Sequence, residues 1–127
     1  MNAEIEKEKE KIIAEWLQKA KDDLESAGVL FKETDNYEIV AYHAHQAIEK
    51  FFKAKLLKRR ETFKFIHDLN SLLQQLYKGG IDQSLLEKIS FVNSLYPRLR
   101  YPTGDAITKE QAGKCLEIAH EIFTAYR

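Results

Sequence analysis

The apolar residues between Glu4 and Phe31 recur at α-helical spacing, and this long periodic segment constrains the fold more than any other feature. Successive apolar positions are one, three, four or seven residues apart, so they gather on one face of a helix. They are Ile5, Ile12, Ile13, Trp16, Leu17, Ala20, Leu24, Ala27 and Phe31. The pattern predicts one long helix. Because only Ile5 is apolar in its first two turns, residues 1–11 are expected to form a helix extension that projects from the body of the protein or frays.

Turn-forming residues then predict a reversal and a second long helix. The segment KETDN has little apolar content and several residues that favour turns and caps. A second helix is expected from about residue 37 to residue 60, and it would form a hairpin with the first. A short loop and a third, short helix follow, which Asp68 can cap and the pair Gly79 and Gly80 can end.

Two more helices are predicted in the last third of the chain. Asp82 can cap a fourth helix that runs to about Tyr96. Helix cannot continue smoothly through the next segment, PRLRYPTGD, because it contains two prolines. Thr108 and Gln111 have the spacing of a capping box and would open a last helix of clear helical period.

The composition agrees with a helical chain that forms one domain. The 127 residues are 44% hydrophobic and 31% charged, with only five glycines and two prolines, which disfavours disorder and strand-rich folds. This length encloses one hydrophobic core. We therefore expect a single all-α domain over residues 1–127 with about five helices, three long and two shorter.

Charge and cysteine content exclude several functional classes. The formal charge is zero, with 20 basic and 20 acidic residues, so binding to nucleic acid would have to depend on a local site. Cys115 is the one cysteine, which excludes an internal disulfide and fits the cytoplasm. The charged N-terminus does not resemble a signal peptide, and no apolar run is long enough to span a bilayer. No membrane association is expected.

The stretch YHAHQAIEKFFK in the second helix carries a polar stripe. Tyr42, Gln46, Glu49 and Lys53 are four, three and four residues apart, so they share a narrow arc of the helix. An apolar arc on the other side would suffice to bury the helix. By pattern alone, the stripe is a solvated face with a Glu49–Lys53 pair that contributes ~0.3–0.5 kcal/mol.

Four segments together resemble the HEPN domain family. They are WLQKAKDDLESAGVLF, HQAIEKFFKAKLL, HDLNSLL and YPRLRYP, and they keep the order and approximate separation of the family's motifs from about Trp16 to Tyr126. The resemblance implies an up-and-down antiparallel helical bundle that commonly forms a homodimer. It also implies a minimal nucleotidyltransferase as a partner, the two proteins forming a toxin–antitoxin-like pair.

The resemblance further implies a nucleotide- or RNA-phosphate-binding site. The matching positions are Gln46, Glu49, Lys50, Lys53, His67, Asp68, Tyr96, Arg98, Arg100, Tyr101 and Pro102. Two guanidinium groups and two phenol rings between prolines can grip a phosphate and stack a base. The plainer alternative is that Arg98 and Arg100 bridge to acidic residues of neighbouring helices. If the second helix faces this loop, the polar stripe and the arginines share a cleft.

Some members of the wider family are metal-independent ribonucleases, which leaves the question of enzymatic activity open for this chain. That chemistry needs an arginine followed four to six residues later by a histidine, so that imidazole and guanidinium act on one phosphate. No histidine follows Arg98 or Arg100 at this spacing. Arg60 and His67 have a similar spacing but span a helix end and a loop, so they are weak catalytic candidates.

Other constellations favour no cofactor and no metal. His43 and His45 are two residues apart, which places them on different sides of a helix, and no zinc or phosphate-loop motif occurs. Three functions therefore remain open. They are a nucleotide- or RNA-binding component of a toxin–antitoxin-like pair, a metal-independent endoribonuclease, and a non-catalytic structural homodimer whose polar stripe seals the interface between subunits.

Overall fold

The computed structural model describes residues 2–63, 67–96 and 105–125, and these contain five α-helices and no strand. They are α1 (Ala3–Glu33), α2 (Tyr37–Lys58), α3 (Leu69–Leu76), α4 (Gln83–Ser94) and α6 (Lys109–Ala125). The expected all-α bundle of three long and two shorter helices is confirmed.

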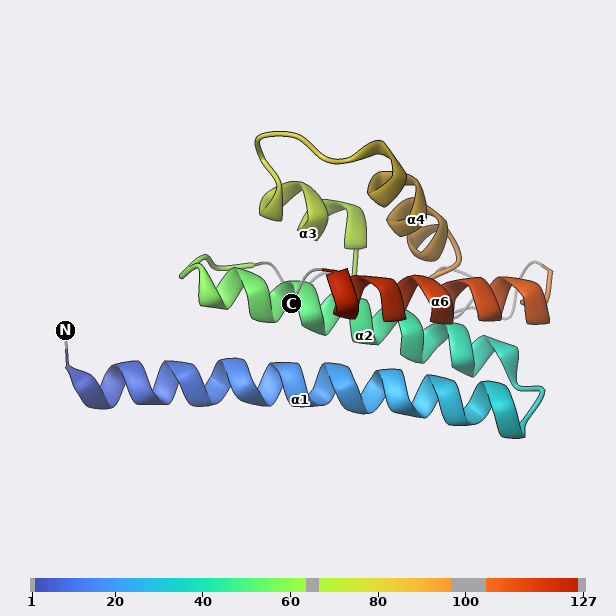
Figure 1. Cartoon of the computed structure of the whole chain (residues 1–127), viewed down its shortest axis with the longest axis horizontal. Helices are drawn as coiled ribbons and strands as arrows, with labels where there is room; N and C mark the ends of the chain where they lie inside the picture. Colours follow the sequence, from blue (N-terminus) through green and yellow to red (C-terminus); the bar gives the residue numbers. More distant parts are fainter. Residues whose placement is uncertain (1, 64–66, 97–104, 126–127) are drawn as a thin grey trace.

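The helices form two layers. α1 and α2 are an antiparallel hairpin, and α6 packs along both of them, running beside α2 in the same direction (Figure 1). α3 and α4 form a shorter second layer that packs on α2 and α6. The first turns of α1 extend beyond the end of α2 in Figure 1, and Ile5 is 49% exposed. The N-terminal extension is thus helical from Ala3, and its fraying stays a prediction.

Helix starts and ends follow the capping residues that the sequence offers. Asp68 accepts a hydrogen bond from the backbone N–H of Asn70 at 3.1 Å, and Asp82 accepts one from that of Leu85 at 3.2 Å. Both predicted caps are confirmed. α2 ends two residues before the predicted end, because Arg60 adopts a left-handed conformation with φ 61° that a helix cannot include.

The capping box at the start of α6 is also confirmed. The backbone N–H of Gln111 donates to Thr108 Oγ1 at 3.1 Å, and the backbone N–H of Thr108 donates to Gln111 Oε1 at 3.0 Å. We expect Thr108→Ala to lower the free energy of unfolding by about 1 kcal/mol, because one N-terminal N–H of α6 loses its acceptor. Urea denaturation measures this change, and Thr124→Ala near the other end of α6 is the control.

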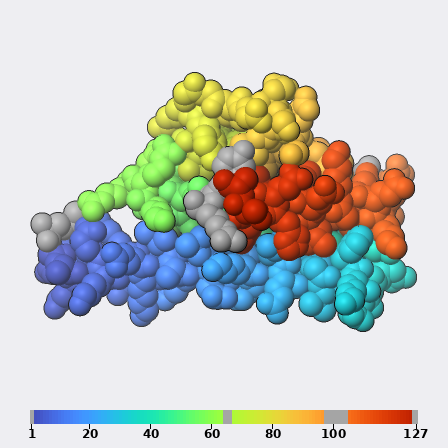
Figure 2. Space-filling view, viewed as in Figure 1, coloured from blue at the N-terminus to red at the C-terminus, as the bar shows by residue number. Residues whose placement is uncertain are grey.

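α2 is the central helix of the core. Thirteen of its 22 residues are buried, and they lie on nearly every side of the helix rather than on one face. The cause is that α1, α6, α3 and α4 all pack on it. Little of the middle of α2 can be seen between α1 and α6 in Figure 2. Polar residues of α2 are therefore enclosed together with the apolar ones.

Candidate functional site

The polar stripe of α2 is enclosed in the protein. Glu49 and Lys53 are each 3% exposed and Gln46 is 7% exposed, so the interpretation of the stripe as a solvated face is wrong. Tyr42, one turn earlier on the stripe, is 37% exposed and marks the point where the stripe reaches the surface. Burial of a carboxylate and an ammonium group is costly unless each has a partner.

Glu49 is the centre of a small charged cluster. Its Oε1 accepts a hydrogen bond from Nδ1 of His67 at 2.8 Å, and its Oε2 accepts one from Nζ of Lys53 at 3.3 Å. The Lys53 ammonium also lies 5.8 Å from the ring centroid of Trp16 and 5.2 Å from that of Phe63. The faces of aromatic rings attract cations. The cluster therefore joins α1, α2 and the segments on both sides of residues 64–66 around one carboxylate.

His67 connects this buried carboxylate with solvent. Its side chain is 46% exposed, and its ring stacks on that of Tyr96 with centroids 5.2 Å apart. The following residue, Asp68, accepts a hydrogen bond from Asn93 Nδ2 at 2.9 Å, while Asn93 Oδ1 accepts the backbone N–H of Leu69 at 2.9 Å. Hydrogen bonds from Ser71 and then Asn93 lower the pKa of Asp68. α4 thus fixes the segment that carries His67.

His45 is a second histidine of the site, for which the sequence predicted no role. It is fully buried, and its ring centroid lies 4.4 Å from that of Tyr96. Among the described residues, no group reaches either ring nitrogen with good hydrogen-bond geometry, and the backbone of His67 and the side chain of Asn93 interact with the ring only weakly. Burial, followed by the nearby His67, lowers the pKa of His45 to about 4, although Asn93 and the backbone of His67 offset part of this effect. The ring is therefore neutral at pH 7.

Gln46 adds another polar group with an open hydrogen-bonding position. Its Nε2 is buried and has no acceptor within the described part of the chain. Gln46 and His45 are adjacent on α2, and His45 touches Tyr96, the last described residue before the segment 97–104. Buried polar atoms are normally hydrogen-bonded, so these groups identify the place on α2 where a polar partner would be favourable.

Lys50 belongs to a different cluster from Glu49 and His67. Its Nζ lies 2.5 Å from Asp23 Oδ2, and His43 Nδ1 lies 2.9 Å from Asp23 Oδ1. Asp23 is on α1, so these contacts join the two helices of the hairpin. Lys50 thus has a structural role in the α1–α2 contact, and its part in ligand binding stays a prediction.

Arg60 and His67 have separate partners. Arg60 Nη2 lies 3.1 Å from Glu6 Oε2 on α1, and the arginine side chain is 62% exposed. His67 instead forms a hydrogen bond with Glu49. Glu49 lies nine residues, or about 13 Å along the helix axis, before Lys58, the last residue of α2 and a near neighbour of Arg60 in sequence. Their partners therefore lie at different places along the hairpin, and a joint catalytic role stays a prediction.

The arginine–tyrosine loop lies outside the described residues. This applies to Arg98, Arg100 and Tyr101, so the cleft that they were expected to share with the α2 stripe stays a prediction. Tyr96, which belongs to the same motif, is described, and its ring contacts those of His45 and His67. The motif therefore begins at the charged cluster.

Metal binding and thiol chemistry have no visible basis in the described residues. These residues contain no group of three or more His, Cys, Asp or Glu side chains that could hold a metal ion. Cys115 is buried, and burial raises the pKa of its thiol to about 12, which disfavours the reactive thiolate. None of the described helices is long and apolar enough to cross a membrane.

Comparisons with known proteins agree with this architecture. A protein of Methanocaldococcus jannaschii named "Putative toxin MJ1304" is 29% identical over 124 aligned positions, covering 84% of this chain and 80% of that protein. The crystal structure of ST0689, an archaeal HEPN homologue, matches with a TM-score of 0.72 and 22% identity, covering 89% of this chain and 93% of that one. The crystal structure of TT1696 from Thermus thermophilus matches with a TM-score of 0.75 and 23% identity, covering 88% and 93%.

The TM-scores of the two structural matches establish the fold of this chain. Because both matches are below 25% identical, they establish the fold alone. The family follows from the sequence itself, because the HEPN domain profile matches residues 13–127, which include nearly all of the helical bundle. This chain is a member of the HEPN domain family.

Proposed function

We propose that this protein binds a nucleotide or RNA phosphate beside His67, as one component of a toxin–antitoxin-like pair with a minimal nucleotidyltransferase. The observation that carries the proposal is the position of His67. Its side chain is half-exposed, and two contacts fix its orientation. One is the hydrogen bond to the buried carboxylate of Glu49, and the other is the stacking on the ring of Tyr96. The name of the M. jannaschii relative supports a toxin-like role.

The hydrogen bond to Glu49 orients the imidazole toward solvent. A carboxylate can only accept hydrogen bonds, so Nδ1 of His67 carries the proton of this bond. Nε2 has no partner among the described residues and is the atom available to a ligand. A histidine whose tautomer is fixed by a carboxylate is typical of binding and proton-transfer sites.

The binding site would also use the residues that follow Tyr96 in the sequence. Arg98 and Arg100 come two and four residues after it, and guanidinium groups form bidentate hydrogen bonds with phosphate. Gln46, Glu49 and Lys53 would form the polar base of the site, with Tyr101 available for stacking. The neutral net charge of the chain means that affinity would come from these local groups.

Fluorescence anisotropy with a labelled single-stranded RNA in excess chelator tests this proposal, with ATP and GTP as competitors. We expect Arg100→Ala to weaken binding about tenfold or more, because a hydrogen bond to a charged group contributes about 1.5–3 kcal/mol. The dependence of affinity on salt should also become less steep. Lys19→Ala, which removes an exposed cation from α1, is the control and should leave affinity unchanged.

Two results would contradict the proposal. One is a wild-type protein that binds neither RNA nor either nucleotide. The other is an Arg100→Ala variant that binds as tightly as the Lys19→Ala variant. A third measurement concerns the partner, because a small nucleotidyltransferase gene in the neighbouring reading frame would support the pair, and co-purification of the two products would test it.

A metal-independent endoribonuclease is the second candidate, and the His67–Glu49 hydrogen bond favours it. A carboxylate that orients an imidazole prepares it for general acid–base work on a 2′-hydroxyl. Against it stands the absence of a histidine four to six residues after Arg98 or Arg100. The same labelled RNA separates the two candidates, since an enzyme would cleave it in excess chelator and His67→Ala would abolish cleavage.

We further propose a cytoplasmic homodimer. In the alternative of a purely structural dimer, the second subunit would bury Gln46 and Glu49. Both residues are already buried within one chain, so their burial does not require a second subunit. Light scattering of the purified protein measures the oligomeric state. A Glu49-centred site that binds RNA or nucleotide would decide against the purely structural alternative.

A further inference from the structure

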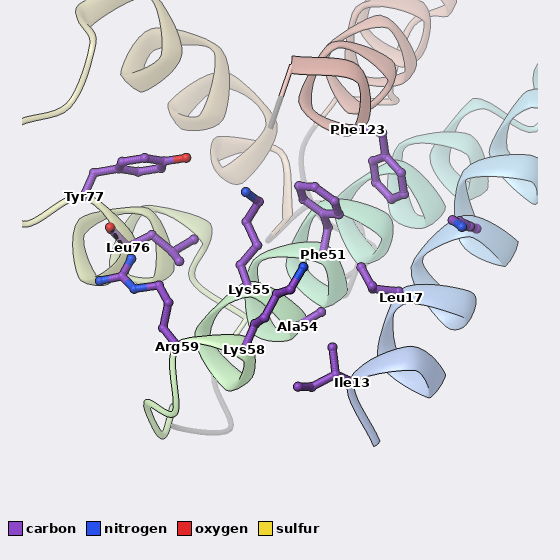
Figure 3. A pocket seen from close by; sticks show the side chains of 11 residues that line it. Ile13, Leu17, Phe51, Ala54, Lys55, Lys58, Arg59, Leu76, Tyr77 and Phe123 are labelled. Carbon is purple, nitrogen blue, oxygen red and sulfur yellow. Dashed lines mark hydrogen bonds between the residues drawn. The ribbon is translucent and has the colours of Figure 1, made fainter. Parts of the chain in front are cut away.

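A second pocket of the protein lies away from the charged cluster. It has a volume of about 680 Å³ and lies between α1, α2, the end of α3 and α6 (Figure 3). The α2 residues that line it are Phe51, Ala54, Lys55 and Lys58. At 100° per residue they face roughly opposite to Gln46, Glu49 and Lys53. The pocket and the proposed phosphate site are therefore different surfaces of one helix.

The interior of this pocket is apolar. Its walls are formed by aliphatic and aromatic side chains of all four elements, namely Ile13, Leu17, Phe51, Ala54, Leu76 and Phe123. Phe51 and Phe123 stack with ring centroids 4.6 Å apart. The volume is within the range of roughly 300–1,000 Å³ that is typical of sites for small molecules. An apolar molecule or chain would bury its surface favourably there.

The rim is positively charged and contains no carboxylate. Lys21, Lys55, Lys58 and Arg59 line the pocket, and no Asp or Glu is among the described residues that do. Arg59 Nη2 forms an ion pair with Glu61 Oε2 at 2.9 Å, and its Nη1 donates a hydrogen bond to the carbonyl oxygen of Leu76 at 2.5 Å. None of the three lysines has an acidic partner in the described part of the chain. The pocket therefore has an excess of positive charge.

Lys55 is a partly buried cation of this pocket. Its ammonium lies 5.4 Å from the ring centroid of Phe51, and burial followed by the charges of Lys58 and Arg59 lowers its pKa. In Figure 3, Lys55 and Lys58 extend from α2 in similar directions, Lys55 into the space between Tyr77 and Phe51 and Lys58 toward Phe51. An anionic group placed there would reduce the repulsion between the cations.

We propose that this pocket binds an amphipathic organic carboxylate, with its apolar chain against Phe51 and Leu17 and its carboxylate between Lys55 and Lys58. A nucleotide fits the chemistry less well. The walls offer few acceptors for the donor groups of a base, since they contain no carboxylate or side-chain amide and Tyr77 is the one uncharged polar residue among the described residues that line them. An acyl chain has no such requirement, and its charged end matches the lysines.

Calorimetry of the full chain with decanoate, below its micelle-forming concentration, tests this proposal. Decanol, acetate and AMP are the comparison ligands. We expect decanoate to bind at least tenfold more tightly than decanol, which lacks the charge, and than acetate, which lacks the chain. Lys55→Gln/Lys58→Gln should weaken decanoate binding about tenfold, and Lys19→Gln, a charge change outside the pocket, should leave it unchanged.

A second variant tests the position of the ligand independently of charge. Leu17→Trp places a large ring at the half-buried edge of the pocket and should abolish decanoate binding. The proposal is overturned if decanol binds as well as decanoate, if AMP binds in the pocket with equal affinity, or if the double lysine variant and Leu17→Trp both bind decanoate normally. It is also overturned if decanoate does not bind, and a loss of self-association in Leu17→Trp would then show that a second copy covers the pocket. RNA binding by Leu17→Trp should persist, which separates this test from that of the phosphate site.

Discussion

Replacement of Glu49 by glutamine is expected to lower the free energy of unfolding by about 3–5 kcal/mol, the usual cost of leaving one partner of a buried ion pair alone. Glu49 is the acceptor for both Lys53 and His67. Lys53 is 3% exposed, so water cannot replace the lost carboxylate. The rings of Trp16 and Phe63 compensate only part of its charge, because a cation–π contact contributes about 0.5–2 kcal/mol.

Replacement of the other partner, Lys53→Met, is expected to lower the free energy of unfolding by less. Glu49 retains His67 as a hydrogen-bond donor, and the methionine side chain preserves most of the contact with Trp16 and Phe63. The double variant Glu49→Gln/Lys53→Met should lose less stability than the sum of the two single variants, since it leaves no unpaired buried charge. Urea denaturation of all four proteins gives this coupling energy directly.

Lys88→Met with Glu121→Gln is the matched control. This pair also joins an ammonium and a carboxylate, at 2.6 Å, but its side chains are about 40% exposed. Exposed pairs contribute roughly 0–1 kcal/mol, so neither the single variants nor the double variant should change stability strongly. Equal effects at the two pairs would show that Glu49 and Lys53 are solvated in solution, contrary to the enclosed cluster described above.

The local structure of this protein could be predicted from its sequence because it depends on neighbouring residues. Asp68, Asp82 and the Thr108–Gln111 capping box each act within three residues of the helix start that they mark. The apolar period of the first segment likewise predicts α1, and the turn-forming segment predicts the hairpin. Such signals need no knowledge of how the helices pack.

The burial of the α2 stripe could not be predicted in the same way. The sequence shows an apolar arc that suffices to bury one side of α2, and the other side is buried because His67 and Tyr96, 18 residues and more away in sequence, fold over it. Charged residues at helical spacing are usually solvated, so the pattern favoured the wrong environment for Glu49 and Lys53. Only the motif resemblance predicts that the stripe belongs to a binding site, and this stays a prediction.

His45 is the clearest residue that pattern analysis missed. A single histidine in a helix carries no signal of its environment, and its spacing from His43 served only to exclude a shared metal. Its full burial against Tyr96 depends on the end of α4 reaching α2. That burial has a measurable consequence, because the neutral and protonated forms of an enclosed imidazole differ greatly in free energy.

The stability of the protein is expected to fall by about 3 kcal/mol between pH 6.5 and pH 4 on account of His45 alone. The pKa of this group is about 4 in the folded protein and 6.5 without the influence of the fold. Below pH 6.5 the unfolded chain therefore binds a proton that the folded chain does not bind, and stability decreases as pH falls through this window. Each unit of pKa difference corresponds to about 1.4 kcal/mol.

Replacement of His45 by phenylalanine isolates this contribution. The phenyl ring can keep the contact with Tyr96 and removes two buried nitrogens that have no partner among the described residues, so stability at pH 7 should be preserved or increased. The decrease in stability from pH 6.5 to pH 4 should be smaller than in the wild type by about 3 kcal/mol. Carboxylates that do not interact with His45 contribute equally to both proteins and cancel in the comparison.

His120→Phe is the control, because it removes a histidine that is not enclosed by the fold. His120 is exposed on α6, so its replacement should leave the pH dependence of urea denaturation unchanged. If His45→Phe also leaves it unchanged, the imidazole of His45 must reach water or a hydrogen-bond partner in solution. The contact between His45 and Tyr96 makes this result relevant to the proposed site, because a proton on His45 would place a positive charge beneath the ring on which His67 stacks.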